Sequence, residues 1–139
     1  MEDYATFEQA KALKELGFDW ECHYHYETNR LLAPNVKTLY YSMDIDSDDL
    51  CFDVNGHNIG DISAPTLAQA QKWLREVKGI EVGVFADFDI GLPNGKWVWI
   101  MRKFNTYLCD TIFPEDNINY DSYEQALSAG IDKALELLK

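Results

Sequence analysis

The stretch TLAQAQKWLREVKG, residues 66–79, predicts an amphipathic helix that covers a sheet. The Thr66 hydroxyl can accept a backbone N–H from the first turn, which is the usual way to cap a helix start. Gly79 offers the left-handed conformation that commonly ends a helix. The apolar residues between these two signals recur at helical spacing on one side, at Leu67, Ala70, Trp73, Leu74 and Val77.

The same start signature occurs twice more, in Thr6-Phe7-Glu8-Gln9-Ala10 and in Ser122-Tyr123-Glu124-Gln125-Ala126, so three helices are predicted. The first should end at Gly17, in the sequence Leu16-Gly17-Phe18. Gly130 lowers the helix propensity of the third by about 1 kcal/mol against Ala, so the first turns of that helix look weak. Its apolar stripe is Leu127, Ile131, Ala134, Leu135 and Leu138.

Between the helices the period changes from 3.6 to 2, which is typical of strands. One strand should run from Trp20 to Glu27, with further strands near 36–43, 50–54, 82–88, 96–101 and 107–112. We expect Leu92-Pro93-Asn94-Gly95 to form the turn of a hairpin. The sequence thus predicts an α+β fold, a mostly antiparallel sheet of about five or six strands with three helices packed mainly on one face. The similar spacing of the three caps leaves a duplicated helix-plus-meander unit open.

The composition predicts one folded domain spanning residues 1–139. A chain of 139 residues with 47% apolar and 14% aromatic residues can bury a core without disulfides. Its three cysteines are odd in number and far apart, so we expect reduced thiols. The N-terminus has neither the basic stretch nor the apolar core of an export signal, and we expect a cytoplasmic protein.

The formal charge of −12 disfavours direct binding to nucleic acid or to anionic membranes. A basic protein partner or a cation would be attracted instead. The acidic run at residues 44–49 resembles the start of a calcium loop, through Asp44, Asp46, Asp48 and Asp49. Its sixth position is Asp49 where that loop needs Gly, and its twelfth is Asn55 where the loop needs Glu, so a solvated acidic connection is the preferred interpretation.

A second polar group alternates along the first predicted strand, at Glu21, His23, His25 and Glu27. Two imidazoles at i and i+2 between carboxylates can bind a transition metal, although an exposed polar strand face explains the pattern as well. The cysteines and His57 show no zinc-type pairing, and no nucleophile elbow or phosphate-binding glycine loop is present. We therefore predict no cofactor, no metal and no catalytic residue.

Residues 96–101 are apolar on both faces, because Trp97, Trp99 and Met101 alternate with Val98 and Ile100. Either this strand is sandwiched in the core, or one face is exposed and meets a partner. The first interpretation is favoured for the tryptophans, whose large side chains a small domain needs to bury. The second makes Trp97 and Trp99 candidate interaction residues.

The segments SAPTLAQAQKWLRE, residues 63–76, and YDSYEQAL, residues 120–127, resemble small proteins of phages, prophages and mobile elements of gut Bacteroides-like bacteria. Such proteins also begin with a Phe-Glu-Gln-Ala-Lys helix followed by Gly-Phe-Asp-Trp, so the resemblance extends over nearly the whole chain. No activity is known for that group. The resemblance implies a cytoplasmic accessory protein of a mobile element.

The preferred functional hypothesis is a non-enzymatic interaction or regulatory protein that engages a protein partner, with a nucleic-acid-binding host protein as one candidate. The alternative is a small-ligand or metal-binding domain that uses the face carrying Glu21, His23, His25 and Glu27. A third option is self-association through a sheet edge or the Trp97 face.

Overall fold

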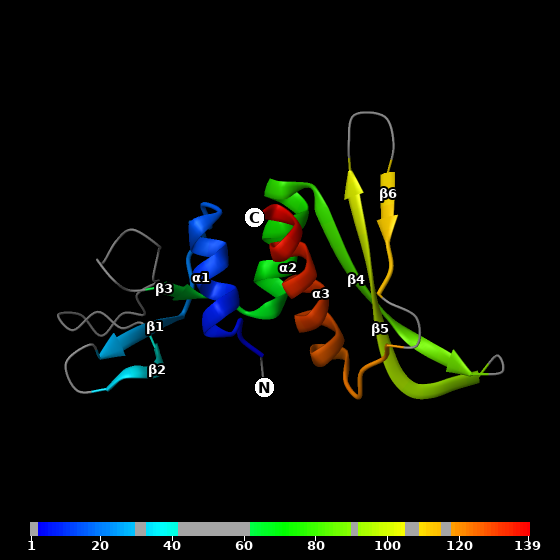
Figure 1. Ribbon diagram of the computed structural model, residues 1–139, viewed down its shortest axis with the longest axis horizontal. Helices are drawn as coiled ribbons and strands as arrows, with labels where there is room; N and C mark the ends of the chain where they lie inside the picture. Colours follow the sequence, from blue (N-terminus) through cyan, green and yellow to red (C-terminus); the bar gives the residue numbers. More distant parts are fainter. Residues whose placement is uncertain (1–2, 30–32, 42–61, 90–91, 105–108, 115–117) are drawn as a thin grey trace. The chain divides into compact units, whose positions relative to one another are not determined.

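The computed structural model describes residues 3–29, 33–41, 62–89, 92–104, 109–114 and 118–139. The chain divides into two compact units, Met1–Thr66 and Leu67–Lys139. Helices and antiparallel strands occur in both, so the predicted α+β class is confirmed (Figure 1). The prediction of one domain over residues 1–139 stays a prediction.

The first unit begins with helix α1, Phe7–Glu15, whose ends are set by local chemistry. The Thr6 hydroxyl accepts the Gln9 N–H at 3.2 Å and the Gln9 side chain accepts the Thr6 N–H at 2.9 Å, which is a complete capping box. At the other end Gly17 has a φ of 97° and the Phe18 N–H donates to the Leu13 carbonyl at 2.9 Å. Both ends lie where the sequence predicts them.

The sheet of the first unit has the strand order β2-β1-β3, with β1 at Tyr24–Asn29, β2 at Ala33–Tyr41 and β3 at Ile62–Ala64. The tyrosines of β1 pack toward the N-terminal segment: the Tyr26 hydroxyl donates to the Ala5 carbonyl at 2.7 Å, and its ring meets Phe7 edge-on at 5.6 Å. Burial raises the pKa of Tyr26. The predicted strand start at Trp20 is wrong, because the chain still bends at His23 between α1 and β1.

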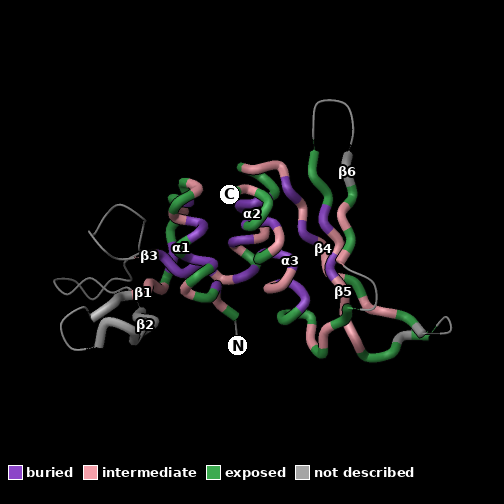
Figure 2. Tube along the Cα trace, in the orientation of Figure 1, coloured by how far each residue is buried: buried purple, intermediate pink, exposed green. Residues whose placement is uncertain are grey.

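The second unit contains α2 at Leu67–Lys78, β4 at Ile80–Asp89, β5 at Leu92–Phe104, β6 at Cys109–Ile112 and α3 at Tyr123–Leu138. Its strands form an antiparallel meander in the order β4-β5-β6. Both helices lie on the same side of this sheet (Figure 1). Buried positions line the helices and the facing sides of β4 and β5 (Figure 2): Trp73, Leu74, Ile80, Val82, Trp99, Met101, Ile131 and Leu135.

The helical stripes are confirmed except at the last position of each, since Val77 of α2 is 52% exposed and Leu138 of α3 is only partly buried. Gly130, which weakens the sequence pattern of α3, is buried in the structure. A Cβ atom at this position would lie 2.6 Å from Val82 Cγ1 and 3.1 Å from Trp99 Cβ. The missing side chain therefore lets α3 approach the sheet closely, which helix propensity alone does not reveal.

The predicted hairpin of β4 and β5 is present, but the prediction that residues 92–95 form its turn is wrong. Leu92 pairs with Asp89 and Pro93 with Phe88, so the expected turn residues belong to β5. The register shifts between Ala86 and Phe88, and Gly95 has a φ of 78°. The turn-forming residues of the sequence thus form an irregularity within the strand instead of its end.

The prediction of a single sheet of five or six strands is also wrong. In the described part of the chain the strands form two separate sheets of three. The predicted strand at 50–54 lies outside the described residues. The two strand orders differ, so they do not support a repeated helix-plus-meander unit. In the described ranges, no helix is long and apolar enough to cross a membrane.

Candidate functional site

The two faces of the β4-β5-β6 sheet have different surroundings. Helices α2 and α3 pack on the face that carries Val82, Trp99 and Met101. Because successive strand residues point to opposite faces, the register places a second set of side chains on the other side. We call this side the open face; it carries Glu81, Gly83, Phe85, Val98, Ile100, Arg102 and Phe104.

The open face exposes aromatic side chains. Phe85 is 50% and Phe104 is 51% exposed, and between them Val98 and Ile100 are half-buried. Single exposed apolar residues are ordinary, whereas a contiguous apolar group on one sheet face is typical of an interaction surface.

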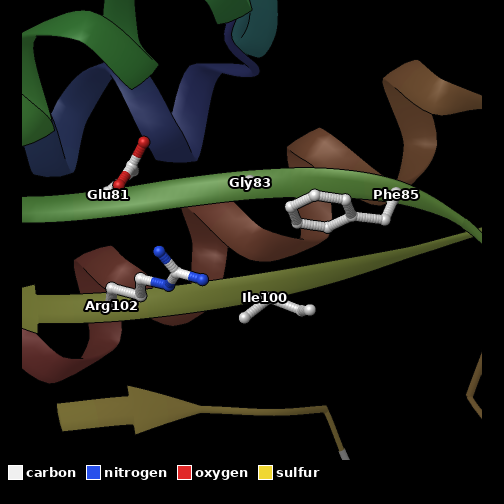
Figure 3. A pocket seen from close by; sticks show the side chains of 5 residues that line it. All are labelled: Glu81, Gly83, Phe85, Ile100 and Arg102. Carbon is white, nitrogen blue, oxygen red and sulfur yellow. The ribbon is translucent and has the colours of Figure 1, made fainter.

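A small hollow of about 70 Å³ lies at the centre of this face, lined by Glu81, Gly83, Phe85, Ile100 and Arg102 (Figure 3). Gly83 forms its floor because it has no side chain. The Phe85 ring leans back over it, and a Cβ atom at Gly83 would lie 2.9 Å from Phe85 Cε2. The hollow thus combines an exposed stretch of backbone with an aromatic wall.

The charged residues of the hollow lie at one end, where Glu81 and Arg102 are directly opposite each other on adjacent strands. Figure 3 shows the Arg102 side chain across from Glu81, with its guanidinium group toward β4, while the Glu81 carboxylate points away from Arg102. In the part of the chain that the structure describes, the Arg102 side chain makes no ion pair or hydrogen bond. Its guanidinium group is available to a carboxylate from outside the sheet.

The far end of the hairpin is fixed by a polar network. The Asp87 carboxylate accepts hydrogen bonds from Asn94 Nδ2 at 3.0 Å and from Asn119 Nδ2 at 3.2 Å. The Asn94 and Asn119 hydrogen bonds lower the pKa of Asp87. Next to it Tyr120 exchanges two backbone hydrogen bonds of 2.8 Å with Trp97, so the segment before α3 is attached along β5.

The tryptophans predicted as interaction residues lie on the opposite face. Trp99 is only 5% exposed and Met101 on the same face is fully buried, so the prediction that Trp99 and Met101 belong to the core is confirmed. The Trp97 ring meets Tyr123 edge-on at 5.6 Å, at the start of α3. The sequence therefore identified a strand with two apolar faces, but the exposed face is the one that carries Val98 and Ile100.

The predicted polar group of the first unit is only partly brought together. His25 and Glu27 lie in β1, opposite Tyr40 and Thr38, whereas Glu21 and His23 precede the strand. Within the described residues, no three or more His, Cys, Asp or Glu side chains are grouped as they would need to be to hold a metal ion. The acidic candidates Asp44, Asp46, Asp48 and Asp49 lie outside the described residues.

Sequence reasoning missed Gly83, Phe85 and Arg102. The alternation in the predicted strand at 82–88 indicates a single apolar face, through Val82, Val84, Ala86 and Phe88. The signal that could have revealed the open face is Phe85, an aromatic residue two positions after Gly83, on the strand face opposite the apolar one.

No family model, curated protein or solved structure matches this chain. The resemblance to small proteins of phages and mobile elements therefore stays a prediction from the sequence.

Proposed function

We propose that this chain is a non-enzymatic interaction protein that docks onto a protein partner through the open face. The observation that carries the proposal is the position of Phe85 and Phe104, which are half exposed on a sheet face opposite the helix-covered one. Aromatic residues and arginine are the side chains most enriched in protein interfaces. Here both kinds lie on one surface together with Arg102.

The size of the hollow supports a protein over a small-molecule ligand. Sites that enclose a small molecule measure roughly 300 to 1,000 Å³. The hollow of about 70 Å³ can receive the end of one partner side chain. The surrounding strands supply a flat surface on which the rest of an interface can lie.

The test compares proteins captured by three tagged forms of the chain from a bacterial lysate: wild type, Phe85→Glu and Val77→Glu. The control is closely matched, because Val77 is 52% exposed and Phe85 50%, but Val77 lies on α2. We expect Phe85→Glu to reduce capture of the partner by about tenfold or more, the effect of roughly 1.4 kcal/mol of binding energy. Val77→Glu should capture as well as wild type.

A partner that all three forms capture equally would contradict the proposal. Repeating the capture at about 0.5 M salt separates two kinds of contact, because exposed charge pairs are screened there and apolar contacts are not. A partner that is lost in salt but indifferent to Phe85→Glu would bind the acidic surface instead, as the sequence-based hypothesis of a basic partner expects.

A further inference from the structure

The open face is complementary to itself. Its three central cross-strand pairs are Glu81 with Arg102, Gly83 with Ile100, and Phe85 with Val98. The two residues of each pair differ in a complementary way. The first pair is an acid and a base, the second a glycine and a branched residue, and the third an aromatic and an aliphatic residue. A surface built in this way can match its own image.

A two-fold rotation matches the open face with that of a second copy. Its axis runs parallel to the strands in the plane between the two stacked sheets, over the line midway between β4 and β5. A second sheet placed face to face by this rotation brings its β5 over β4 of the first, and its β4 over β5. Glu81 then faces the partner's Arg102, Gly83 faces the partner's Ile100, and Phe85 faces the partner's Val98. Every contact is made twice, as in any isologous interface.

Shape and charge agree in this arrangement. The partner's Ile100 is aimed at the hollow over Gly83, whose volume of about 70 Å³ can receive the end of one side chain. The Arg102 guanidinium, which has no acidic partner among the described residues, receives the partner's Glu81.

We infer that the partner of the open face is a second copy of this chain, stacked sheet on sheet around Gly83 and Ile100. The inference rests on the proposed function, since it names the occupant of the same surface. Stacked sheets lie about 10 Å apart and their strands cross at up to about 30°. The facing residues are therefore best aligned at the central pair, Gly83 and Ile100. The second units of the two copies then form four layers, with the two sheets inside and each pair of helices outside.

The charge of the face favours a copy over a basic partner. Glu81 and Arg102 cancel, so the open face contributes no net charge although the chain carries −12. A basic protein is attracted by the excess acids elsewhere, not by this surface. A second copy satisfies both charges of the face at once.

The area of the face limits the strength of the dimer. Seven paired residues each of β4 and β5 and the four residues of β6, at about 3.3 Å per residue and about 4.8 Å per strand, give a footprint of roughly 300 Å² per copy. Stable complexes bury about 800 Å² per partner. The footprint is well below this size, so we expect a weak dimer whose population rises with protein concentration.

The experiment is sedimentation velocity on the full chain from about 10 to about 500 μM, a range that resolves weak dimers. Wild type, Glu81→Arg, Arg102→Glu, the equimolar mixture of the two variants, and the double variant are compared. Each single variant places like charges against each other at two symmetric contacts, so we expect its association to fall about tenfold or more. The mixture and the double variant restore opposite charges at both contacts and should return to within about threefold of wild type.

Recovery in the mixture depends on contact between the two positions across copies, which an effect on folding within one chain does not produce. A wild type that stays monomeric throughout the range overturns the inference, as does a dimer that neither single variant weakens. If the chain is monomeric but still captures another protein through Phe85, this inference fails and the proposed function stands. If neither occurs, both fail.

Discussion

Gly130 allows α3 to lie closely against the sheet, and its replacement should destabilise the protein. In an exposed helix, Gly→Ala adds about 1 kcal/mol of stability. Here the added Cβ atom would lie 2.6 Å from Val82 Cγ1 and 3.1 Å from Trp99 Cβ, so we expect Gly130→Ala to lower the free energy of unfolding by about 1 to 3 kcal/mol. Chemical denaturation measures the change.

The control for Gly130 is a double-mutant cycle with Val82→Ala, which removes the atom of closest approach. Val82→Ala alone should destabilise through lost packing, but the two changes together should cost less than their sum. An increase in stability on Gly130→Ala would contradict the close approach of helix and sheet. Sequence patterns could not predict this contact, because it depends on which strand atoms lie beneath the helix.

The Asp87 carboxylate links three segments and should make stability depend on pH. Its hydrogen bonds to Asn94 and Asn119 lower its pKa below the value of about 3.9 expected for an unfolded chain. A lowered folded pKa contributes stability above about pH 4, and this contribution is lost as the pH falls through the folded value. Asp87→Asn imitates the protonated carboxyl group, so its difference from wild type in the free energy of unfolding should shrink below about pH 4.

Denaturation at pH 7 and pH 3 checks this expectation. Asn119→Ala is the matched control, because it removes one donor and should reduce the pH dependence while Asp87 remains. A difference between wild type and Asp87→Asn that is equal at both pH values would show that these hydrogen bonds do not favour the charged form.

At the scale of elements, Trp73 is the largest fully buried side chain of α2 and is 1% exposed. Trp73→Ala should cost about 3 to 5 kcal/mol, because it removes a large buried side chain and leaves a cavity. Val77→Ala on the same helix should cost much less, since Val77 is 52% exposed. Urea midpoints for the two variants provide the measurement, and equal midpoints would refute the assignment of the buried face.

The helices were predictable from sequence, since their determinants are local. Thr6, Gln9 and Gly17 interact within α1 and its ends, and Ser122 caps α3 by accepting the Gln125 N–H at 3.1 Å. The segment before α3 was not predictable in the same way. Its attachment joins Tyr120 to Trp97 and Asn119 to Asp87, and no periodicity in either segment specifies the other.

At the scale of the whole molecule, alternation predicted strands but not their partners. It cannot distinguish one sheet of six strands from two sheets of three, because it reports the two faces of a strand and nothing about its neighbours. For the same reason, alternation could not show which face of β5 would be exposed. The pattern of residues 96–101 showed two apolar faces, and only the positions of α2 and α3 decide that Trp99 is covered while Ile100 is on the open face.

The acidity of the chain is unevenly distributed between its two units. Residues 1–66 contain 4 Lys and Arg against 13 Asp and Glu, a net charge of −9. Residues 67–139 contain 8 against 11, a net charge of −3. The unit with the open face is thus the less charged, which favours contact between two copies there and leaves the first unit as the region to which a basic partner would be attracted.

This distribution predicts how salt affects the inferred dimer. Two chains that each carry −12 repel each other over about 30 Å at 0.01 M salt, but only over about 10 Å at 0.1 M. The contacts of Glu81 with the partner's Arg102 are partly buried and are screened much less. Association should therefore tighten severalfold between about 0.01 and about 0.15 M salt.

Sedimentation velocity over a salt series tests this, with a variant that carries Asp3→Asn and Glu15→Gln as its control. Both positions are exposed and belong to the first unit, whereas the open face belongs to the second, and the two changes reduce the net charge from −12 to −10. Less repulsion between copies should flatten the salt dependence and strengthen the dimer at low salt. Association that weakens as salt is added would instead mean that attraction between opposite charges, and not burial of Phe85 and Ile100, holds the copies together.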